Sequence, residues 1–367
     1  MSGAAGRHAS PYKTYTLSNL DQIPQLATLP REVREDIRIV GSVLPFKVNN
    51  YVVDELIDWD DALDDPIFHL TFPQREMLLP EHHAAAAVVA EEGVDPARRR
   101  AVIDGIRSLL NPHPAGQMDK NVPEIDGERL WGVQHKYRET VLFFPSAGQT
   151  CHAYCTFCFR WPQFIGMSEF KFASRETESL VRYLREHPEA TDLLFTGGDP
   201  LIMSAAVLSR YVEPFLEPDN GTNIQTIRLG TKALGYWPYR FLTDPDADDL
   251  LRLFERVTGL GLNLAVMAHF SHPRELGTPA VREAIARIRS TGAQIRTQSP
   301  LLRHINDSSD TWARMWREQV NLNCTPYYMF IARNTGAQHY FAVPLVEAWD
   351  IWRGAYRRRP THNPHEE

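Results

Sequence analysis

The fold is indicated first by one short apolar run and the loop after it, which read Val141-Leu142-Phe143-Phe144-Pro145 and Gln149-Thr150-Cys151-His152-Ala153-Tyr154-Cys155-Thr156-Phe157-Cys158-Phe159-Arg160. The apolar run predicts a buried strand, and three of the four cysteines of the chain follow it within eight residues. In barrels and open α/β sheets, the loops at the carboxyl ends of the strands carry the chemistry. The CxxxCxxC spacing can therefore place three thiolates around one metal centre at that end of the sheet.

Downstream of this loop, short apolar runs alternate with amphipathic helical stretches. The predicted strands cover residues 141–145, 192–196, 226–230, 262–269, 294–298 and 325–331. After the first step they recur about every 30 to 40 residues, which is the spacing of a strand and its crossover helix. Six such units span about 190 residues, whereas a closed eight-fold barrel needs about 250. We predict an α/β fold with a partial, TIM-like (β/α)6 barrel over residues 141–345, and a doubly wound sheet is the alternative.

The two ends of the chain differ from this pattern. Residues 1–140 contain many prolines and short helical bursts at 33–40 and 96–110, so we predict a mainly helical N-terminal region packed on the barrel. Its first 15 or so residues are expected to be loose. Residues 346–367 predict a short C-terminal helix followed by a disordered polar tail.

Composition excludes several classes of protein. The chain has 367 residues, a formal net charge of −7 and 43% hydrophobic residues, which argues against wholesale disorder. It has no apolar stretch of about 18 residues that could span a membrane, and its N-terminus lacks the apolar core of a secretory signal. Four cysteines are too few for a disulfide scaffold. We expect a cytoplasmic protein whose partners include neither nucleic acid nor membrane.

Two plainer interpretations of the cysteine cluster are a structural zinc site and thiols without any metal. Zinc normally takes four ligands, and His152, between two of the cysteines, suits a closed tetrahedron poorly. Three soft ligands without a nearby fourth favour an iron–sulfur cluster that leaves one iron open. We interpret Cys151, Cys155 and Cys158 as its ligands and Cys324 as a core residue.

The loop resembles the signature of the radical S-adenosylmethionine (SAM) enzymes. In that family the three cysteines of CxxxCxxC bind a [4Fe-4S] cluster, and SAM occupies the fourth iron. Phe157 matches the usual aromatic residue before the last cysteine. The resemblance implies that Cys151, Cys155 and Cys158 hold the cluster. It also implies an external reductant of the flavodoxin or ferredoxin type, because the sequence has no second cysteine cluster.

A second motif follows the second predicted strand and reads Leu193-Leu194-Phe195-Thr196-Gly197-Gly198-Asp199-Pro200. Two glycines allow another backbone or a ligand to approach closely, although an isolated pair is more often a tight turn. A nucleotide phosphate loop is less favoured, because no GxGxxG or GxxxxGKS-type motif occurs nearby. Here the motif resembles the radical SAM loop that holds the amino group of SAM. The predicted cofactor contacts are Thr196, Gly197, Gly198, Asp199, Arg228, Thr231 and His269.

The ends of the later strands narrow the resemblance to the lysine 2,3-aminomutase branch. They read Ile227-Arg228-Leu229-Gly230-Thr231-Lys232, Ala268-His269-Phe270-Ser271-His272-Pro273-Arg274-Glu275, Gln298-Ser299-Pro300-Leu301-Leu302-Arg303-His304-Ile305-Asn306-Asp307 and Pro326-Tyr327-Tyr328-Met329-Phe330-Ile331-Ala332-Arg333-Asn334. Members of that branch use SAM to make a 5′-deoxyadenosyl radical, which abstracts a hydrogen from an amino acid. The amino group then migrates between adjacent carbons through an imine with pyridoxal phosphate (PLP).

We predict three catalytic residues, two from the resemblance and one, Arg333, where this chain departs from it. Arg160 matches the arginine that pairs with the substrate carboxylate, a task that suits the fork of a guanidinium. Asp307 matches one of two aspartates that hold the distal ammonium in lysine-specific members. The second aspartate falls where this chain has Arg333, with Asn334 beside it. A cation at that position should reject lysine, so we expect an amino acid other than lysine, with glutamate or a similar acidic compound as a candidate.

The use of PLP is an open expectation. In the family the PLP lysine lies in a glycine-rich segment beyond the sixth strand, and no lysine occurs here after Lys232. Lys136, Lys171 and Lys232 lack the right context. The chain is therefore either truncated or works without PLP. The alternatives to an aminomutase-like enzyme are a PLP-independent radical SAM enzyme that does another hydrogen abstraction, and a truncated, inactive cluster-binding homologue. A homo-oligomer is a further expectation.

Overall fold

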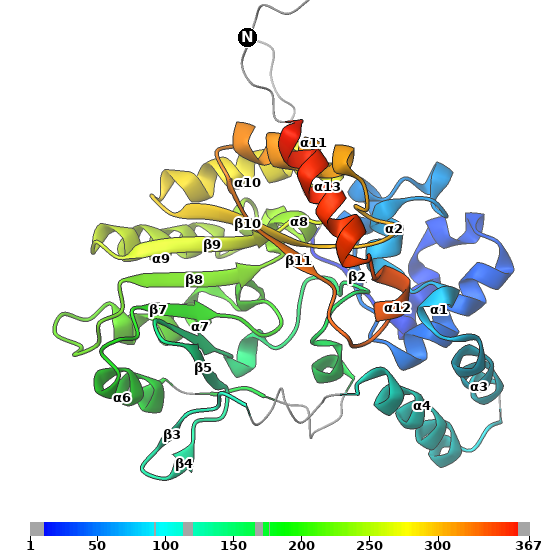
Figure 1. Cartoon of the computed structure of the whole chain (residues 1–367), viewed down its shortest axis with the longest axis horizontal. Helices are drawn as coiled ribbons and strands as arrows, with labels where there is room; N and C mark the ends of the chain where they lie inside the picture. Colours follow the sequence, from blue (N-terminus) through cyan, green and yellow to red (C-terminus); the bar gives the residue numbers. More distant parts are fainter. Residues whose placement is uncertain (1–10, 92, 113–119, 166–171, 176, 359–367) are drawn as a thin grey trace, which may run out of the picture.

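The largest sheet curls into an open half-barrel (Figure 1). The structure, a computed structural model, describes residues 11–91, 93–112, 120–165, 172–175 and 177–358. The sheet has seven strands in the spatial order β11-β10-β9-β8-β7-β6-β5. Their bounds are β5 Val133–Tyr137, β6 Thr140–Phe143, β7 Asp192–Phe195, β8 Thr226–Thr231, β9 Asn263–His269, β10 Gln294–Leu301 and β11 Thr325–Ile331.

The strand order decides between the two predicted topologies. Strands β6 to β11 pair in parallel, each with the next strand along the chain. A doubly wound sheet would reverse its order at a switch point, and this sheet does not. The partial (β/α)6 barrel is therefore confirmed, and the doubly wound alternative is wrong.

Strand β5 corrects the sequence analysis, which assigns no strand to residues 1–140. It turns back on β6 as an antiparallel neighbour, with Val133 opposite Phe143. Its sequence, Val-Gln-His-Lys-Tyr, is mostly polar and becomes exposed toward Tyr137. An edge strand of this kind lacks the continuous apolar run that marks a buried strand. The same region also contains the short pairs β1 Thr14–Tyr15 with β2 Val48–Asn49, and β3 Glu124–Ile125 with β4 Glu128–Arg129.

A helix follows each of the strands β6 to β10 along the chain. The bounds of these helices are α6 Glu178–Glu186, α7 Ala205–Val212, α8 Ala233–Tyr236, α9 Ala247–Gly259, α10 Pro279–Ser290 and α11 Ser309–Asn321. Ser204, Thr278 and Ser308 cap three of them by accepting from a backbone N–H three residues on. Thr177 precedes α6, and Ser174 forms a β-bridge with Pro145.

The N-terminal region is mainly helical within its described residues. Its α-helices are α1 Arg31–Val43, α2 Pro66–Thr71, α3 Pro80–Ala90 and α4 Pro96–Leu110. Proline occupies the first turn of α2, α3 and α4, where its missing N–H costs no hydrogen bond. Figure 1 shows this blue-to-cyan part beside one end of the barrel strands.

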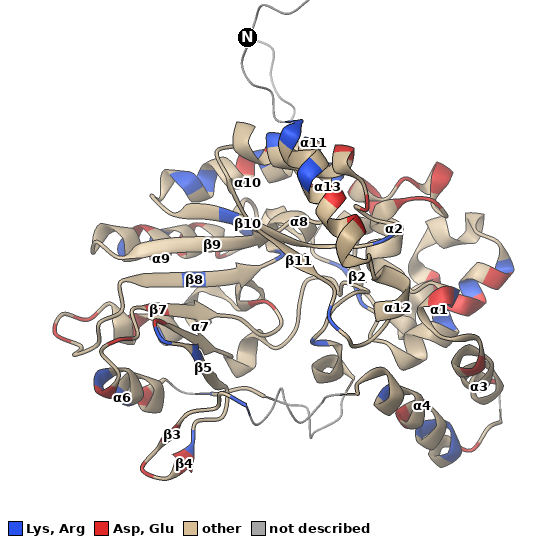
Figure 2. Cartoon of the chain, viewed as in Figure 1, with Lys and Arg blue, Asp and Glu red and all other residues tan. Residues whose placement is uncertain are grey.

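The chain closes with α12 Gln338–Phe341 and α13 Leu345–Arg357, and α13 packs on α11. The predicted C-terminal helix is thus present. Residues 1–10 of the predicted loose N-terminus and residues 359–367 of the predicted tail lie outside the described residues. Figure 2 shows both signs of charge mixed over the helices in this view. None of the helices in the described ranges has the length and apolar character needed to cross a bilayer.

Candidate active site

The cysteine loop is held by the N-terminal region on the residues between its cysteines. The backbone N–H of Tyr154 donates to the carbonyl of Lys47 at 2.8 Å, and that of Thr156 donates to the carbonyl of Leu70 at 3.0 Å. The hydroxyl of Thr156 also donates to the carbonyl of His69 at 2.7 Å. Two separate segments of the N-terminal region therefore fix the course of the loop, because each supplies a carbonyl that a loop donor would otherwise lack.

A buried asparagine links the same loop to the barrel. The side-chain amide of Asn49 is fully buried and donates to the carbonyls of His152, at 3.2 Å, and Tyr236, at 2.8 Å. The hydroxyl of Tyr12 donates to the same His152 carbonyl at 2.8 Å. Asn49 therefore sets the spacing between the cysteine loop and α8, which follows β8.

The three loop thiols lie within electrostatic range of one another. Burial is the main reason why the pKa of all three thiols is raised, and the pKa of Cys158 is raised to about 12. Neighbouring thiols raise the pKa of Cys151 and Cys158 further, since two thiolates would repel each other. Three soft sulfur donors in one loop suit an iron–sulfur cluster. In the described ranges, however, no three Cys, His, Asp or Glu side chains stand ready to hold a metal ion. The donor set fits, and the thiols would have to turn toward a common point.

His152 does not extend this donor set. Its side chain is buried, and its Nδ1 has no partner among the described residues. Burial, followed by the charges of Arg240 and Lys47, lowers the pKa of His152 to about 3. The ring packs edge-to-face with Tyr12, with the centroids 5.8 Å apart. His152 is therefore a neutral ring in the protein interior.

The two glycines after β7 seat that loop against the cysteine loop. A Cβ on Gly198 would lie 2.4 Å from the carbonyl oxygen of Thr150, and Gly197 has a φ of +136°. The backbone N–H of Asp199 donates to the carbonyls of Thr150, at 2.8 Å, and Gly148, at 3.0 Å. The Gly-Gly pair thus serves a close approach between two loops of the protein itself.

The carboxylate of Asp199 joins the ends of β7 and β8. It is 2% exposed and accepts from the hydroxyl of Thr231 at 2.7 Å and from the backbone N–H groups of Leu201 and Lys232, each at 2.9 Å. Burial raises its pKa, although these hydrogen bonds act in the opposite direction. The structure therefore places residues 196–199 and Thr231 together beside the cysteine loop. The Asp199 carboxylate is already hydrogen-bonded within the protein.

Arg228 lies at the opposite end of the strands. Its Nε donates to Asp192 at 2.7 Å, and a second nitrogen donates to the hydroxyl of Thr140 at 3.3 Å. Asp192 and Thr140 are the first residues of β7 and β6. The guanidinium thus ties together the amino ends of three strands, and the structure does not bring it to the cysteine loop.

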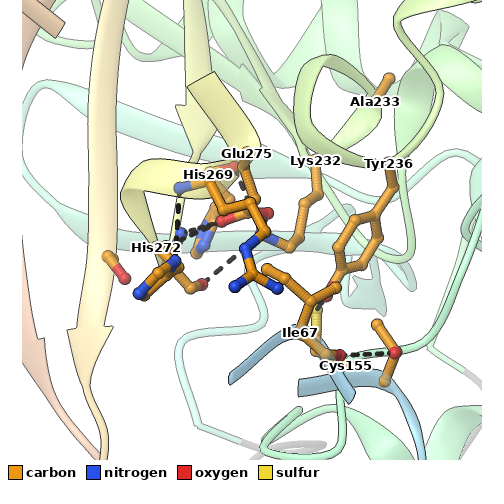
Figure 3. Close-up of polar contacts among 12 residues, drawn as sticks. Ile67, Cys155, Lys232, Ala233, Tyr236, His269, His272 and Glu275 are labelled. Carbon is orange, nitrogen blue, oxygen red and sulfur yellow. Dashed lines mark hydrogen bonds and ion pairs between the residues drawn. The ribbon is translucent and has the colours of Figure 1, made fainter. Parts of the chain in front are cut away.

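A buried ionic cluster lies beside Cys155 (Figure 3). The ammonium of Lys232 lies 2.5 Å from Glu275, which is fully buried, and 4.4 Å from the centre of the Tyr236 ring. The hydroxyl of Tyr236 lies 3.5 Å from the Sγ of Cys155. The carbonyl of His269 accepts from Lys232 at 3.4 Å, and burial followed by the Lys232 charge lowers the pKa of His269 to about 3.

Two guanidinium groups meet over one phenylalanine ring. Arg333 lies 5.2 Å and Arg160 lies 5.7 Å from the ring centre of Phe159, and Arg160 also lies 4.1 Å over Phe144. Burial first, and then the charge of Arg333, lowers the pKa of Arg160 to about 10, while Cys158 opposes that shift. Within the described part of the chain, the buried Nη1 of Arg160 has no hydrogen-bond partner.

Asp307 belongs to a different set of contacts. Its carboxylate accepts from the backbone N–H of His304 at 3.3 Å, inside a turn in which His304 has a φ of +68°. Arg160 and Arg333 thus come together, whereas the contacts of Asp307 among the described residues do not reach them.

Sequence reasoning missed three residues of this site, Lys47, Asn49 and Tyr236, and it also missed the ion pair of Lys232 with Glu275. Lys47 donates to the hydroxyl of Thr150 at 3.2 Å, and burial lowers its pKa. Only the position of Lys232 and Tyr236 just after β8 offered a signal. Lys171, one of the three lysines that lack the context of a PLP lysine, lies outside the described residues.

Sequence comparison finds relatives that share one family name. No family model matches the chain. It is 30% identical over 323 residues to a putative L-lysine 2,3-aminomutase of Aquifex aeolicus (strain VF5), covering 88% of this chain and 74% of that protein. It is 23% identical over 341 residues to the L-lysine 2,3-aminomutase of Bacillus subtilis (strain 168), covering 93% of this chain and 62% of that protein.

Among solved structures, a radical SAM methyltransferase from Sphaerobacter thermophilus matches 62% of this chain and 66% of its own, with 15% identity and a TM-score of 0.42. That score is too low to support an inference. The match to the Aquifex protein is sufficient for the family by itself, because 30% identity extends over about three quarters of that relative. The chain belongs to the lysine 2,3-aminomutase family of radical SAM enzymes.

Proposed function

We propose that this radical SAM enzyme moves an amino group between adjacent carbons of an amino acid that is not lysine. The proposed cluster ligands are Cys151, Cys155 and Cys158, and the proposed substrate is glutamate or a similar acidic amino acid. When bound, the [4Fe-4S] cluster and SAM supply the radical chemistry that removes a hydrogen atom from an unactivated carbon. The remaining tasks, which are to bind, orient and shield the substrate, fall to the side chains of the protein.

The observation that carries the substrate proposal is the buried Nη1 of Arg160, two residues from Cys158, which has no hydrogen-bond partner in the ranges that the structure describes. A buried donor without an acceptor costs free energy, so a ligand carboxylate that accepts from it is favoured. Phe144, whose ring lies 4.1 Å from the Arg160 guanidinium, fixes the orientation of that group. Arg160 therefore holds the substrate carboxylate at the edge of the proposed cluster site.

Arg333 is the proposed source of selectivity. It is exposed, and its guanidinium shares the Phe159 ring with Arg160. Two neighbouring cations repel each other, and the lowered pKa of Arg160 reflects part of that repulsion. A substrate with two carboxylates would neutralise both cations, whereas a second ammonium would add a third positive charge. Asp307 remains a proposed substrate residue from motif position alone.

Aromatic side chains around the cysteine loop support the proposal that water is excluded from the site. Tyr154 stacks on Phe164 with the ring centres 4.5 Å apart, and Phe157 packs edge-on against Phe341 at 6.3 Å. Such apolar walls lower the local dielectric and strengthen charge pairing. We propose an external one-electron reductant of the flavodoxin or ferredoxin type, no nucleic-acid or membrane partner, and a homo-oligomer as the assembled form.

Anaerobic reconstitution with iron and sulfide, followed by SAM cleavage with glutamate or lysine, tests the proposal. We expect 5′-deoxyadenosine and methionine to form faster with glutamate, and Arg333→Glu to reverse that preference. Arg353→Glu is the matched control, because Arg353 is an exposed arginine on α13. Faster turnover with lysine in the unaltered enzyme would contradict the substrate assignment. Adding PLP decides whether the amino group migrates or another hydrogen abstraction occurs, and absent cleavage would mark an inactive homologue.

A further inference from the structure

The hydroxyl of Tyr236 lies beside Cys155, one of the three predicted cluster ligands. Tyr236 is 1% exposed, and its Oη lies 3.5 Å from the Sγ of Cys155. That sulfur is the one hydrogen-bond partner of the hydroxyl in the described part of the chain. The ammonium of Lys232 lies 4.4 Å from the centre of the same ring (Figure 3). The side chain of Tyr236 therefore has its hydroxyl at Cys155 and its ring against the ammonium of Lys232.

The position of this hydroxyl is fixed from several sides. The side-chain amide of Asn49 donates both to the carbonyl of Tyr236 and to the carbonyl of His152 in the cysteine loop. Lys232 is held in turn by Glu275, whose carboxylate also accepts from the backbone N–H of His272 at 2.9 Å. Buried contacts therefore hold the backbone of Tyr236 and the cysteine loop in place on both sides of this hydrogen bond.

We propose that Tyr236 is a positioning residue that raises the reduction potential of the cluster by donating a hydrogen bond to Cys155. This inference rests on the proposed function, because it takes Cys155 as a cluster ligand. As a free thiol, Cys155 donates its own proton to the hydroxyl. As a thiolate ligand it has no proton, so the hydroxyl becomes the donor. One electron from the external reductant then enters the cluster without any bond being formed or broken.

The sign of the effect follows from charge. The added electron makes the cluster and its thiolates more negative, and a donor on the sulfur stabilises that reduced form more than the oxidised form. The Lys232 ammonium, 4.4 Å from the Tyr236 ring centre, acts in the same direction because it favours negative charge at Cys155, while the carboxylate of its ion-pair partner Glu275 opposes it. Removing the hydroxyl should therefore make the cluster harder to reduce.

Tyr236→Phe tests this, because it removes the hydroxyl and keeps the ring under Lys232. Tyr183→Phe is the matched control, since Tyr183 is 5% exposed and its hydroxyl bonds His135 instead of a cysteine. Both reconstituted variants should contain as much iron and sulfide as the unaltered enzyme. In a potentiometric titration followed by electron paramagnetic resonance, we expect a more negative midpoint only for Tyr236→Phe. An unchanged midpoint would overturn the inference.

A second measurement uses the unaltered enzyme and so does not depend on the folding of a variant. Electron–nuclear double resonance of the reduced cluster in D2O should show an exchangeable deuteron coupled to the cluster. The absence of that coupling would also count against the hydrogen bond. If the unaltered enzyme fails to assemble any cluster, the proposed function fails. A normal cluster with an unaltered midpoint in Tyr236→Phe defeats only the role of Tyr236.

Discussion

The side-chain amide of Asn49 donates to the carbonyl of His152 at 3.2 Å, which joins residues 103 positions apart in the chain. The same amide donates to the carbonyl of Tyr236 at 2.8 Å, and its oxygen accepts from the N–H of Val52 at 3.0 Å. The N-terminal region thus contributes directly to the cysteine loop. The site is shared between two parts of the chain that the sequence presents as separate.

Asn49→Ala should loosen this link and destabilise the protein. Each buried group left without a partner costs about 1–3 kcal/mol. The change removes the Asn49 donor to the carbonyl of Tyr236 and one of the two donors to the carbonyl of His152, which keeps its bond from Tyr12. We expect a lower free energy of unfolding in urea and less iron retained after reconstitution. Asn223→Ala is the control, since Asn223 is exposed and its side-chain amide donates to the carbonyl of Pro188. Equal stability of the two variants would contradict the role of Asn49.

Gly198→Ala should disturb the packing of the β7 loop on the cysteine loop. The added methyl would lie 2.4 Å from the carbonyl oxygen of Thr150, where no side-chain movement can relieve the overlap. We expect a lower melting temperature and a weaker visible absorption of the cluster. Gly105→Ala, in the exposed face of α4, has open space around it and should instead stabilise the protein by about 0.5–1 kcal/mol. A melting temperature of Gly198→Ala at or above that of the unaltered protein would refute the expected overlap.

Serine at Cys151, Cys155 or Cys158 should abolish cluster assembly, because a hydroxyl is a poor ligand for iron in place of a thiolate. Iron and sulfide analysis after anaerobic reconstitution measures the outcome. Cys324→Ser should keep its iron, since Cys324 is 3% exposed and lies just before β11, away from the loop. Full iron content in any of the three loop variants would remove that cysteine from the ligand set.

His272 should make the protein less stable in mild acid. Burial, followed by the charges of Arg274 and Arg314, lowers its pKa to about 4, below the value of about 6.5 for an unfolded chain. The unfolded chain therefore takes up a proton first as the pH falls, so this contribution is complete above pH 6.5 and is lost between about 6.5 and 4.

His272→Asn should reduce that loss, because it removes the imidazole that takes up the proton. Asparagine can still accept from the Arg274 N–H that His272 caps, so the local turn is kept. Urea unfolding of both proteins at pH 7.5 and 5.5 gives the comparison. The variant should lose less free energy of unfolding between the two pH values than the unaltered protein does. The exposed residue change His339→Asn controls for the loss of an imidazole. An equal pH dependence in His272→Asn and the unaltered protein would rule out this origin.

Much of the barrel could be predicted because its strands carry their own signal. Strands β6 to β10 are buried on at least one face, so their apolar runs persist in the sequence. Strand β5 lacked that signal, since an edge strand satisfies its backbone on one side and tolerates residues such as Gln134 and Lys136. The helix caps at Ser204 and Thr278 are local features as well, because each hydroxyl accepts from a backbone N–H three residues further along the chain.

The sequence by itself determined the chemistry that can be local: three thiols at CxxxCxxC spacing after a strand, a Gly-Gly pair after the next strand, and Arg160 beside the last cysteine. Only the tertiary structure decided which groups meet them. It turned Arg228 to the far end of the strands, paired Arg333 with Arg160 over Phe159, and set Tyr236 against Cys155 across 81 residues. The reason is physical: a motif specifies neighbours along the chain, whereas burial and hydrogen bonding between distant segments fix distances that no local pattern records.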